Sequence, residues 1–406
     1  MYDKMNIFRK VFCRTYQIAF HLAFPILPYR EPKLYEAMEE IKEIVGAEQL
    51  TSVLLVTDKF LYENGLTKKL EAALAACGVR CTVYSDTNAN PTVRNVAEAL
   101  RVYRANQCNG LVAFGGGSSI DCAKAVGARV AYPNKSLDQL KGMLRVLRSI
   151  PTLIAIPTTA GTGSEVTVTA VITDSDTKHK YTMNNFTFIP SYAILDPTVT
   201  YTLPASLTAT TGMDALTHAV EAFIGRSTTK ETRRLALEAV KLIFDNILTA
   251  YREPTNAEAR RNMLVASYKA GVAFSKSYVG YIHAVAHSLG GQYNIPHGLA
   301  NAVLMPIVLD DYGNAVSKKL YILGRAAGVV KENDSVQIGA KKFIAAIRSL
   351  NKQMNIPETL SGIRKEDIPK MARHADKEAN PLYPVPKLMN ARELQKFYIK
   401  VAEGSK

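Results

Sequence analysis

The alternation of short apolar runs with amphipathic stretches between residues 51 and 159 is the feature that most constrains the fold. Four apolar runs have the length and composition of buried strands: 51–58, 81–86, 110–117 and 152–159. Helical spacing fills the gaps between them, at 60–76, 92–106 and 118–130. Parallel strands need long crossover connections, usually helices, so this order predicts a Rossmann-like parallel sheet with helices on both faces. The residues from 164 to 183 then predict a hairpin that turns at Asp174 to Asp176.

The character of the chain changes after Pro204, where strand signals almost disappear. Seven stretches with helical spacing follow: 206–224, 228–251, 256–276, 280–291, 298–312, 336–350 and 391–403. A chain of 406 residues is also long for one hydrophobic core, because typical domains hold roughly 100–200 residues. We therefore predict an α/β domain over residues 1–203 and an all-helical domain over residues 204–406.

The net charge limits the choice of partners. The chain carries 50 Lys and Arg against 36 Asp and Glu, a formal charge of +14, which favours anionic partners such as nucleic acid or membrane surfaces. The basic residues are scattered, however, and no nucleic-acid-binding motif combines them with stacking aromatic residues. We interpret the charge as a solvated basic surface and expect neither nucleic acid nor a membrane as a partner. A non-enzymatic anion-binding protein is the alternative that the charge alone supports.

Two features bear on where the protein resides. The first thirty residues begin basic and turn apolar like a secretory signal, but Arg14, Gln17 and His21 interrupt the apolar part and no small-residue cleavage site follows. We predict instead an N-terminal arm (1–30) that forms an amphipathic helix, packed on the body of the protein or on a second subunit. The five cysteines include no C-x-x-C pair, which is typical of reduced thiols in a cytoplasmic protein.

The segment "FGGGSSIDCAK" (114–124) lies where a predicted strand meets a predicted helix. Glycines such as Gly116 and Gly117 let a backbone approach a phosphate closely, and the N-terminus of the next helix supplies free N–H groups and positive potential. Ser118 is expected to cap that helix. A tight turn without a ligand is the alternative, since the segment lacks the G-x-G-x-x-G pattern of dinucleotide-binding folds.

Two further strand ends support a nucleotide site. Asp58 ends the first clear strand, where a carboxylate can accept hydrogen bonds from a ribose diol and repel a 2′-phosphate, which favours NAD over NADP. The alternative for Asp58 is a helix N-cap. Thr158 and Thr159, in "PTTAGTGSEVT" (157–167), follow another buried strand and are candidate donors to the same cofactor, with a second tight turn as the alternative.

The helical half contains a group of possible metal ligands. Asp214 and His218 are four residues apart, so a helix places both on one face, and His283 and His287 have the same spacing on a later helix. His297 stands at a turn that starts another helix. Either pair alone is best explained as satisfied core residues, but a carboxylate and several imidazoles from separate helices indicate a divalent-metal site.

Four of these segments resemble a known family. The sequences "GGGSSIDCAK", "IPTTAGTGSEVT", "GMDALTHAVEAF" and "HAVAHSLGGQYNIPHGLANAVLMP" resemble the signature segments of the iron-containing (group III) alcohol dehydrogenases, in the same order. The resemblance extends over about residues 51–312. It implies a dinucleotide-binding α/β domain, a helical metal-binding domain and an active site in the cleft between them. The start of the chain departs from the family by lacking the small strand and glycine turn of many members.

The resemblance also implies roles for individual residues. The metal ligands of the family correspond to Asp214, His218, His283 and His297. His287 corresponds to a residue near the nicotinamide that orients substrate or passes a proton to water, and Phe274 to an aromatic wall of the substrate pocket. The cofactor contacts correspond to Asp58, Asn90, Gly116, Gly117, Ser118, Thr158, Thr159 and Lys180.

The implied activity is the interconversion of a small primary alcohol and its aldehyde by hydride transfer with NAD(H). Asp and His ligands suit both Fe(II) and Zn(II), and the family favours iron. The alternatives within the fold class are glycerol or polyol dehydrogenases and dehydroquinate synthases, which also use NAD and a metal but with other ligand spacings. Apolar helix faces in the second half predict a homodimer or higher homo-oligomer.

Overall fold

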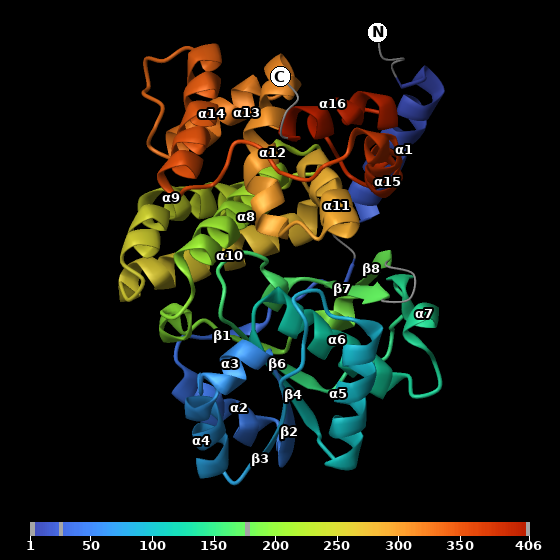
Figure 1. The fold of residues 1–406 in the computed structure, drawn as a ribbon, viewed down its shortest axis with the longest axis vertical. Coiled ribbons are helices and arrows are strands. Elements are labelled where there is room, and N and C mark those ends of the chain that lie inside the picture. Colours follow the sequence, from blue (N-terminus) through green and yellow to red (C-terminus); the bar gives the residue numbers. More distant parts are fainter. Residues whose placement is uncertain (1–4, 24–26, 175–178, 403–406) are drawn as a thin grey trace. The chain divides into compact units, whose positions relative to one another are not determined.

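The chain divides into two compact units, one α/β and one helical (Figure 1). This computed structural model describes residues 5–23, 27–174 and 179–402. The α/β unit comprises Pro28–Leu203, and the helical unit combines Met1–Leu27 with Pro204–Lys406. The N-terminal arm therefore belongs to the helical unit, whereas the sequence analysis placed it in the first domain.

A six-stranded parallel sheet forms the centre of the α/β unit, in the order β1–β9–β6–β4–β2–β3. Its strands are β1 (Lys33–Tyr35), β2 (Ser52–Val56), β3 (Arg80–Tyr84), β4 (Gly110–Gly115), β6 (Thr152–Pro157) and β9 (Tyr192–Ile194). The prediction of a parallel sheet is confirmed. The two edge-side strands β1 and β9 were not predicted, because three residues carry no measurable periodicity. The expectation that the start of the chain lacks a small strand is wrong, since β1 forms there and pairs with β9.

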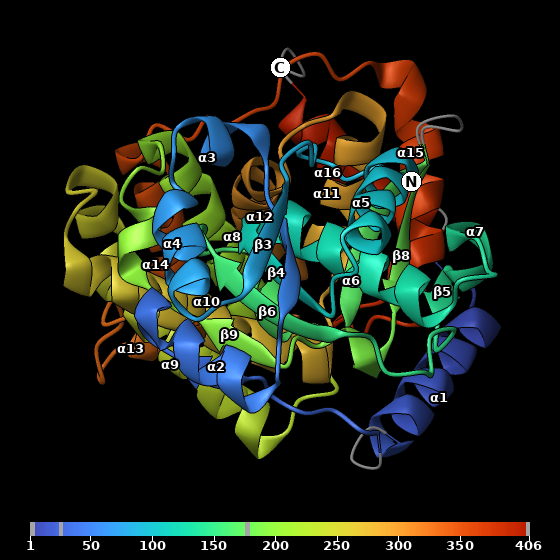
Figure 2. The ribbon, with the colours of Figure 1, turned by 90° about the horizontal axis from the view of Figure 1, so that it is seen from below.

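Helices cover both faces of this sheet because the strands are apolar on both faces. Leu54 and Leu111 belong to one buried cluster, and their neighbours Val53 and Val112 belong to the other. The main helices of the first cluster (Figure 2) are α5 (Val93–Ala105) and α6 (Gly117–Ala131), and those of the second are α2 (Ile41–Ala47) and α4 (Lys68–Ala76).

Two expectations in this unit need refinement. The helix predicted over 60–76 is broken into α3 (Lys59–Glu63) and α4, with Gly65 in the left-handed region at a φ of 71°. The predicted hairpin consists of β7 (Thr169–Asp174) and β8 (His179–Asn184), which pair antiparallel and form a small second sheet with β5 (Gly142–Met143). The turn was predicted at Asp174 to Asp176, and the part of it after Asp174 lies outside the described residues.

A buried lysine links α6 to the segment that follows β6 through hydrogen bonds. Lys124 is fully buried, and its Nζ donates hydrogen bonds to the carbonyl oxygens of Ser164 (2.7 Å), Thr167 (3.0 Å) and Thr169 (2.8 Å). Burial lowers the pKa of Lys124 to about 8. The lysine of the "GGGSSIDCAK" motif thus has a structural role, which the sequence analysis did not assign.

The helical unit contains every helix predicted after Pro204. Its helices are α1 (Ile7–Ala23), α8 (Ala205–Ile224), α9 (Lys230–Arg252), α10 (Ala257–Ser277), α11 (Tyr281–Tyr293), α12 (His297–Tyr312), α13 (Ser317–Ala326), α14 (Val336–Gln353), α15 (Ile368–Ala379) and α16 (Ala391–Val401). Helices α13 and α15, which are short and rich in charged residues, were not predicted. None of the described helices is long and apolar enough to cross a membrane.

Helix α8 lies at the centre of this unit. Its residues are buried almost without interruption from Gly212 to Ile224, because α9, α10 and α12 pack against it. A helix that is apolar on nearly all sides must be buried in this way. Polar residues within it are consequently held in a fixed environment.

Helix α1 is attached to the helical unit through polar contacts. Arg9 forms a bidentate ion pair with Asp376 of α15 at 2.7 and 2.9 Å. Arg14 donates to the carbonyl oxygen of Val385 at 2.8 Å, and Gln17 donates to that of Tyr383 at 2.7 Å. The arm therefore forms an amphipathic helix, as predicted, and packs on the body of the protein beside α15 (Figure 1).

Candidate metal centre and cofactor-binding segments

Two candidate ligands come from the central helix α8. Asp214 and His218 are four residues apart, so one helical turn places them on the same face. Both are buried, with 2% and 5% of their surface exposed. The packing of neighbouring helices around α8 thus holds a carboxylate and an imidazole in a site with little water.

Two more candidates complete a cluster. His283 is the third residue of α11, and His297 is the first residue of α12. Their Nε2 atoms lie 3.8 and 3.5 Å from Oδ1 of Asp214. One donor atom from each of Asp214, His218, His283 and His297 lies within 4.8 Å of the other three. The structure brings together all four predicted ligands.

The chemistry of this cluster fits a divalent cation. Metal–ligand bonds to N and O are roughly 2.0–2.2 Å long, so two ligands of one ion stand about 3–4 Å apart. The distances of 3.8 and 3.5 Å from Oδ1 of Asp214 to His283 and His297 lie in this range. Nε2 of His283 is buried and makes no hydrogen bond among the residues that the structure describes, and a cation would supply the partner that a buried polar atom needs. Burial lowers the pKa of His283 well below its usual value, and the nearby imidazoles of His218 and His297 lower it further. The ring is therefore neutral, which is the form that binds metals.

Two residues without a predicted role contact the ligands. Asn301, fully buried on α12, donates from Nδ2 to Oδ1 of Asp214 at 2.7 Å and lies 3.1 Å from Nε2 of His297. Glu221, on α8, lies 2.6 Å from Nδ1 of His283 through its Oε2. Burial raises the pKa of Glu221 to about 7. Glu221 stands one helical turn after His218, and Asn301 stands one turn after His297. This spacing in the sequence could have identified both residues as partners of the candidate ligands.

His287 and Phe274 lie at the edge of the cluster. The ring of His287 stacks on that of His297 at a centroid distance of 4.9 Å, and the ring of Phe274 stacks on His218 at 4.2 Å. Nδ1 of His287 is 2.6 Å from Oε1 of Glu378, on the unpredicted helix α15. The structure thus places both predicted residues against the candidate metal ligands and adds a carboxylate that was not predicted.

The predicted cofactor residues of the α/β unit gather at one edge of its sheet. Asp58 follows β2, Gly116 and Gly117 follow β4, and Thr158 and Thr159 follow β6. These three strands are parallel neighbours, so their carboxyl ends lie side by side. The carboxyl edge of a parallel sheet is where ligands bind in open α/β folds.

The glycine turn between β4 and α6 is closely packed. Gly115 has a φ of 155°, and a Cβ atom there would lie 2.4 Å from Oγ of Ser119. A Cβ at Gly117 would lie 2.8 Å from Oγ1 of Thr162. A side chain at either position would displace Ser119 or Thr162. The N-cap of α6 is Gly116, which offers no capping side chain, so the first N–H groups of α6 are suited to an anion.

The structure gives three predicted cofactor residues, Ser118, Asp58 and Lys180, positions that bear on their predicted roles. The expectation that Ser118 caps α6 is wrong, because Ser118 lies inside the helix and its hydroxyl donates to the carbonyl oxygen of Ala89 at 2.6 Å. That bond places Ser118 beside the segment that contains Asn90. Asp58 is the N-cap of α3 and accepts from the backbone N–H of Leu61 at 3.0 Å, so its alternative role is observed. Lys180 lies on β8, paired with Thr173, and its side chain is outside the described part.

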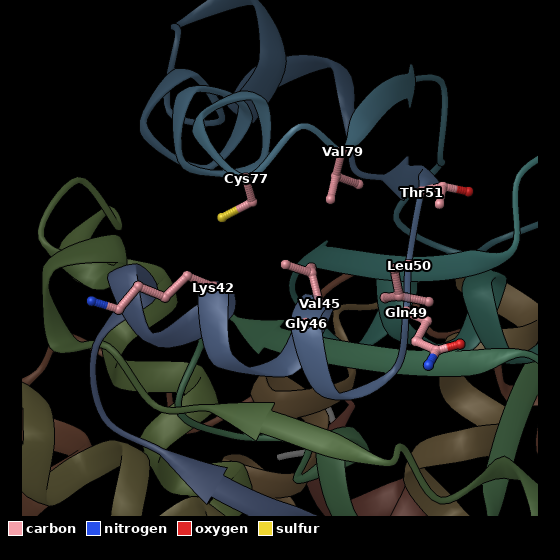
Figure 3. Close-up of a pocket in the computed structure, with 8 residues that line it drawn as sticks. All are labelled: Lys42, Val45, Gly46, Gln49, Leu50, Thr51, Cys77 and Val79. Atoms are coloured by element: carbon pink, nitrogen blue, oxygen red, sulfur yellow. The ribbon is translucent and has the colours of Figure 1, made fainter.

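A pocket of about 350 Å³ lies at the opposite edge of the same sheet (Figure 3). Thr51 and Val79, which line it, immediately precede β2 and β3. Lys42 and Cys77 also line it. Because it lies at the amino ends of the strands, this pocket is separate from the cofactor-binding segments.

A parallel α/β unit with a glycine turn at its carboxyl edge and a helical unit with a buried Asp-His₃ cluster define a class of protein: the metal-dependent dehydrogenases that use a dinucleotide. Comparison with known proteins identifies the family. Residues 35–197 match the iron-containing alcohol dehydrogenases, and residues 208–401 match the C-terminal part of the Fe-containing alcohol dehydrogenase family.

Individual relatives agree with this assignment. The 1,3-propanediol dehydrogenase of Klebsiella pneumoniae is 36% identical over 383 residues, which cover 93% of this chain and 98% of the relative. A solved structure of a 1,3-propanediol oxidoreductase has a TM-score of 0.88 and 35% identity, over 92% of this chain and 98% of that chain. The sulfoacetaldehyde reductase of Bifidobacterium kashiwanohense, solved in complex with NAD⁺, has a TM-score of 0.82 and 30% identity, over 93% and 98%.

The chain belongs to the iron-containing alcohol dehydrogenase family, and it is an oxidoreductase of the alcohol dehydrogenase class. The resemblance found in the sequence and the predicted fold class are confirmed.

Proposed function

We propose that this enzyme interconverts a small primary alcohol and its aldehyde with NAD(H), using Fe(II) held by Asp214, His218, His283 and His297. The observation that carries the proposal is the convergence of these four donor atoms within 4.8 Å, with the buried Nε2 of His283 lacking a hydrogen-bond partner among the described residues. The relatives support a small substrate, since those compared above are named for 1,3-propanediol and sulfoacetaldehyde.

Each bound group has one chemical contribution. The dinucleotide supplies the hydride acceptor, and the cation supplies a Lewis acid that favours the ionised form of an alcohol and polarises a carbonyl. The protein supplies orientation, exclusion of water and proton transfer. Phe274, stacked on His218 at 4.2 Å, presents an apolar wall to the substrate.

His287 is proposed to pass the alcohol proton to water. The carboxylate of Glu378 accepts a hydrogen bond from Nδ1 of His287 at 2.6 Å, so the hydrogen of the neutral ring is on Nδ1 and the lone pair is on Nε2. His287 is half-buried, with 34% of its side chain exposed. It therefore adjoins the buried ligands and also reaches solvent, as a proton carrier must.

For the dinucleotide, we propose that Gly116, Gly117 and Ser118 contact the pyrophosphate and that Thr158 and Thr159 donate to the cofactor. Asn90 and Lys180 are proposed further contacts, by the family resemblance. Asp58 is proposed to bind the ribose diol through its second carboxylate oxygen, since its Oδ1 accepts the capping bond from Leu61. A negative charge at this position favours NAD over NADP.

The decisive experiment compares metal-free and reconstituted enzyme. Exhaustively chelated protein is loaded with Fe(II) or Zn(II) under anaerobic conditions and assayed with a panel of alcohols, aldehydes and polyols, with NAD and NADP in parallel. We expect no turnover without metal, recovery with Fe(II), and a preference for small primary alcohols with NAD. Full turnover by metal-free protein would refute the proposed function, and a preference for polyols would favour the glycerol dehydrogenase alternative.

We also propose that the protein is a cytoplasmic homo-oligomer. Five free cysteines, three of them buried, suit a reducing compartment. Helix α1 exposes large apolar side chains on the side away from its polar anchors, including Phe8 (80%), Phe12 (60%) and Leu22 (72%). An apolar surface of this kind typically marks a protein–protein contact. Light scattering of the wild type and of Phe8→Ser/Phe12→Ser tests this, and an unchanged mass would exclude α1 from the contact.

A further inference from the structure

The buried carboxylate of Glu221 accepts hydrogen bonds at the start of α11 through both of its oxygens. Glu221 is 2% exposed and accepts from the backbone N–H of Gly280 at 2.7 Å through Oε2 and from that of Ile282 at 2.8 Å through Oε1. Its Oε2 also lies 2.6 Å from Nδ1 of His283. These contacts join residues 59 to 62 positions apart in the chain.

We propose that Glu221 is a positioning residue for the metal: it fixes the tautomer and the ring orientation of His283, so that Nε2 presents its lone pair to the cation. This inference rests on the proposed function, because it requires that His283 is a ligand. It concerns a residue outside the predicted ligand set.

The hydrogen-bond pattern determines the tautomer. The backbone N–H groups of Gly280 and Ile282 can only donate, so both oxygens of Glu221 must accept. These backbone donors favour the ionised carboxylate, against the effect of burial. In that form Glu221 has no hydrogen to offer, so Nδ1 of His283 carries the hydrogen and donates it. The neutral ring then has its lone pair on Nε2, the buried atom that lacks a partner in the described structure and faces Asp214. A carboxylate behind a metal-binding histidine acts in this way in many metal sites.

The backbone around Glu221 is shaped to admit this contact. A Cβ atom on Gly280 would lie 2.6 Å from Oε1 and 3.1 Å from Cδ of Glu221. Since Cβ atoms are essentially never found below 3.0 Å from another heavy atom, no larger residue fits at position 280 without displacing the carboxylate. The glycine is explained by the close approach of Glu221, which is separate evidence that the carboxylate is held in place.

A purely structural role for Glu221, as an anchor for the first turn of α11, is the competing explanation. Glu221→Gln separates the two. An amide that faces His283 with its NH₂ group donates to Nδ1, which moves the ring hydrogen to Nε2 and blocks metal binding. An amide turned the other way places its NH₂ group against the N–H of Ile282. We expect Glu221→Gln to weaken Fe(II) binding by about 10–100-fold, the range typical of such partners.

Metal affinity is measured by competition with a chelator for wild type, Glu221→Gln, His283→Ala and the double variant. If Glu221 acts through His283, the double variant binds Fe(II) no more weakly than His283→Ala. Additive losses, or an unchanged affinity of Glu221→Gln, would overturn the proposal. Asp196→Asn is the matched control, because Asp196 is a buried carboxylate that accepts backbone N–H bonds from Met38 and Thr198 but contacts no ligand. It should lower stability and leave metal affinity unchanged.

A measurement on the wild-type protein guards against a variant that fails to fold. With ¹⁵N-labelled histidine, long-range ¹H–¹⁵N spectra of the metal-free protein report the tautomer of each neutral ring, and His283→Ala assigns the signal. We expect the Nδ1–H tautomer for His283, and the Nε2–H tautomer would overturn the proposal. Wild-type protein that binds no divalent cation would instead refute the proposed function.

Discussion

A single added methyl group on α12 should disturb the metal centre through a backbone clash, because its distance to Cβ of the proposed ligand Asp214 is an ordinary 3.5 Å. Gly298 follows His297, and a Cβ atom there would lie 2.4 Å from the carbonyl oxygen of Thr210 on α8 and 2.8 Å from its carbonyl carbon. Ordinary contact begins at 3.4 Å, so α12 and α8 must separate locally by about 1 Å in Gly298→Ala. Both neighbouring atoms are backbone, which cannot rotate aside.

This displacement is large on the scale of metal coordination. α8 carries Asp214 and His218 and α12 carries His297, whereas metal–ligand distances tolerate only about 0.2 Å. Gly298→Ala should therefore lower the affinity for Fe(II) by more than about 100-fold, beyond the loss expected for an outer-shell partner. The overpacking should also cost about 1–3 kcal/mol in the free energy of unfolding of the metal-free protein.

Chelator competition measures the affinity, and urea unfolding of the metal-free protein measures the stability. Gly291→Ala is the matched control: Gly291 is an exposed glycine on α11, and a Cβ there would have no heavy atom within 4 Å. It should retain wild-type affinity and gain up to about 1 kcal/mol of helix stability. A Gly298→Ala protein that folds and binds Fe(II) as tightly as the wild type would refute the claim that the packing of α12 on α8 sets the ligand geometry.

Three other outcomes are expected. Asp58→Asn should keep the helix cap, whereas Asp58→Ala should lower the free energy of unfolding by about 0.5–2 kcal/mol. Both variants should raise the NADP-to-NAD ratio of kcat/KM. An unchanged ratio in Asp58→Asn would show that Asp58 acts only as a helix cap. Glu378→Gln should lower kcat by roughly 10–100-fold through misorientation of His287 while metal content stays constant, and an unchanged kcat would argue against proton transfer there. Burial raises the pKa of Glu165 from 4.5 to about 7, so between these two pH values the folded state keeps a proton that the unfolded state has lost. The free energy of unfolding should therefore fall by roughly 3 kcal/mol as the pH rises from 4.5 to about 7. Urea unfolding of Glu165→Gln at a series of pH values should show a weaker dependence of stability on pH.

The sequence by itself determined those features that depend on local periodicity. The parallel sheet followed from apolar runs that alternate with amphipathic stretches, and the pairing of Asp214 with His218 followed from the pitch of a helix. Both patterns repeat over a few residues, so neighbouring side chains alone specify them. The family motifs also indicated which of the histidines are candidate metal ligands.

Only the tertiary structure decided which distant groups meet. Glu221 and His283 are 62 residues apart, Asn301 and Asp214 are 87 apart, and Glu378 and His287 are 91 apart. No local pattern encodes such contacts, because they depend on how whole helices pack against α8. The three-residue strands β1 and β9 form for the same reason: each gains its hydrogen bonds from a neighbour in the sheet, more than 150 residues away for β1. The chain thus specifies its elements locally, and packing selects which polar groups support the ligands.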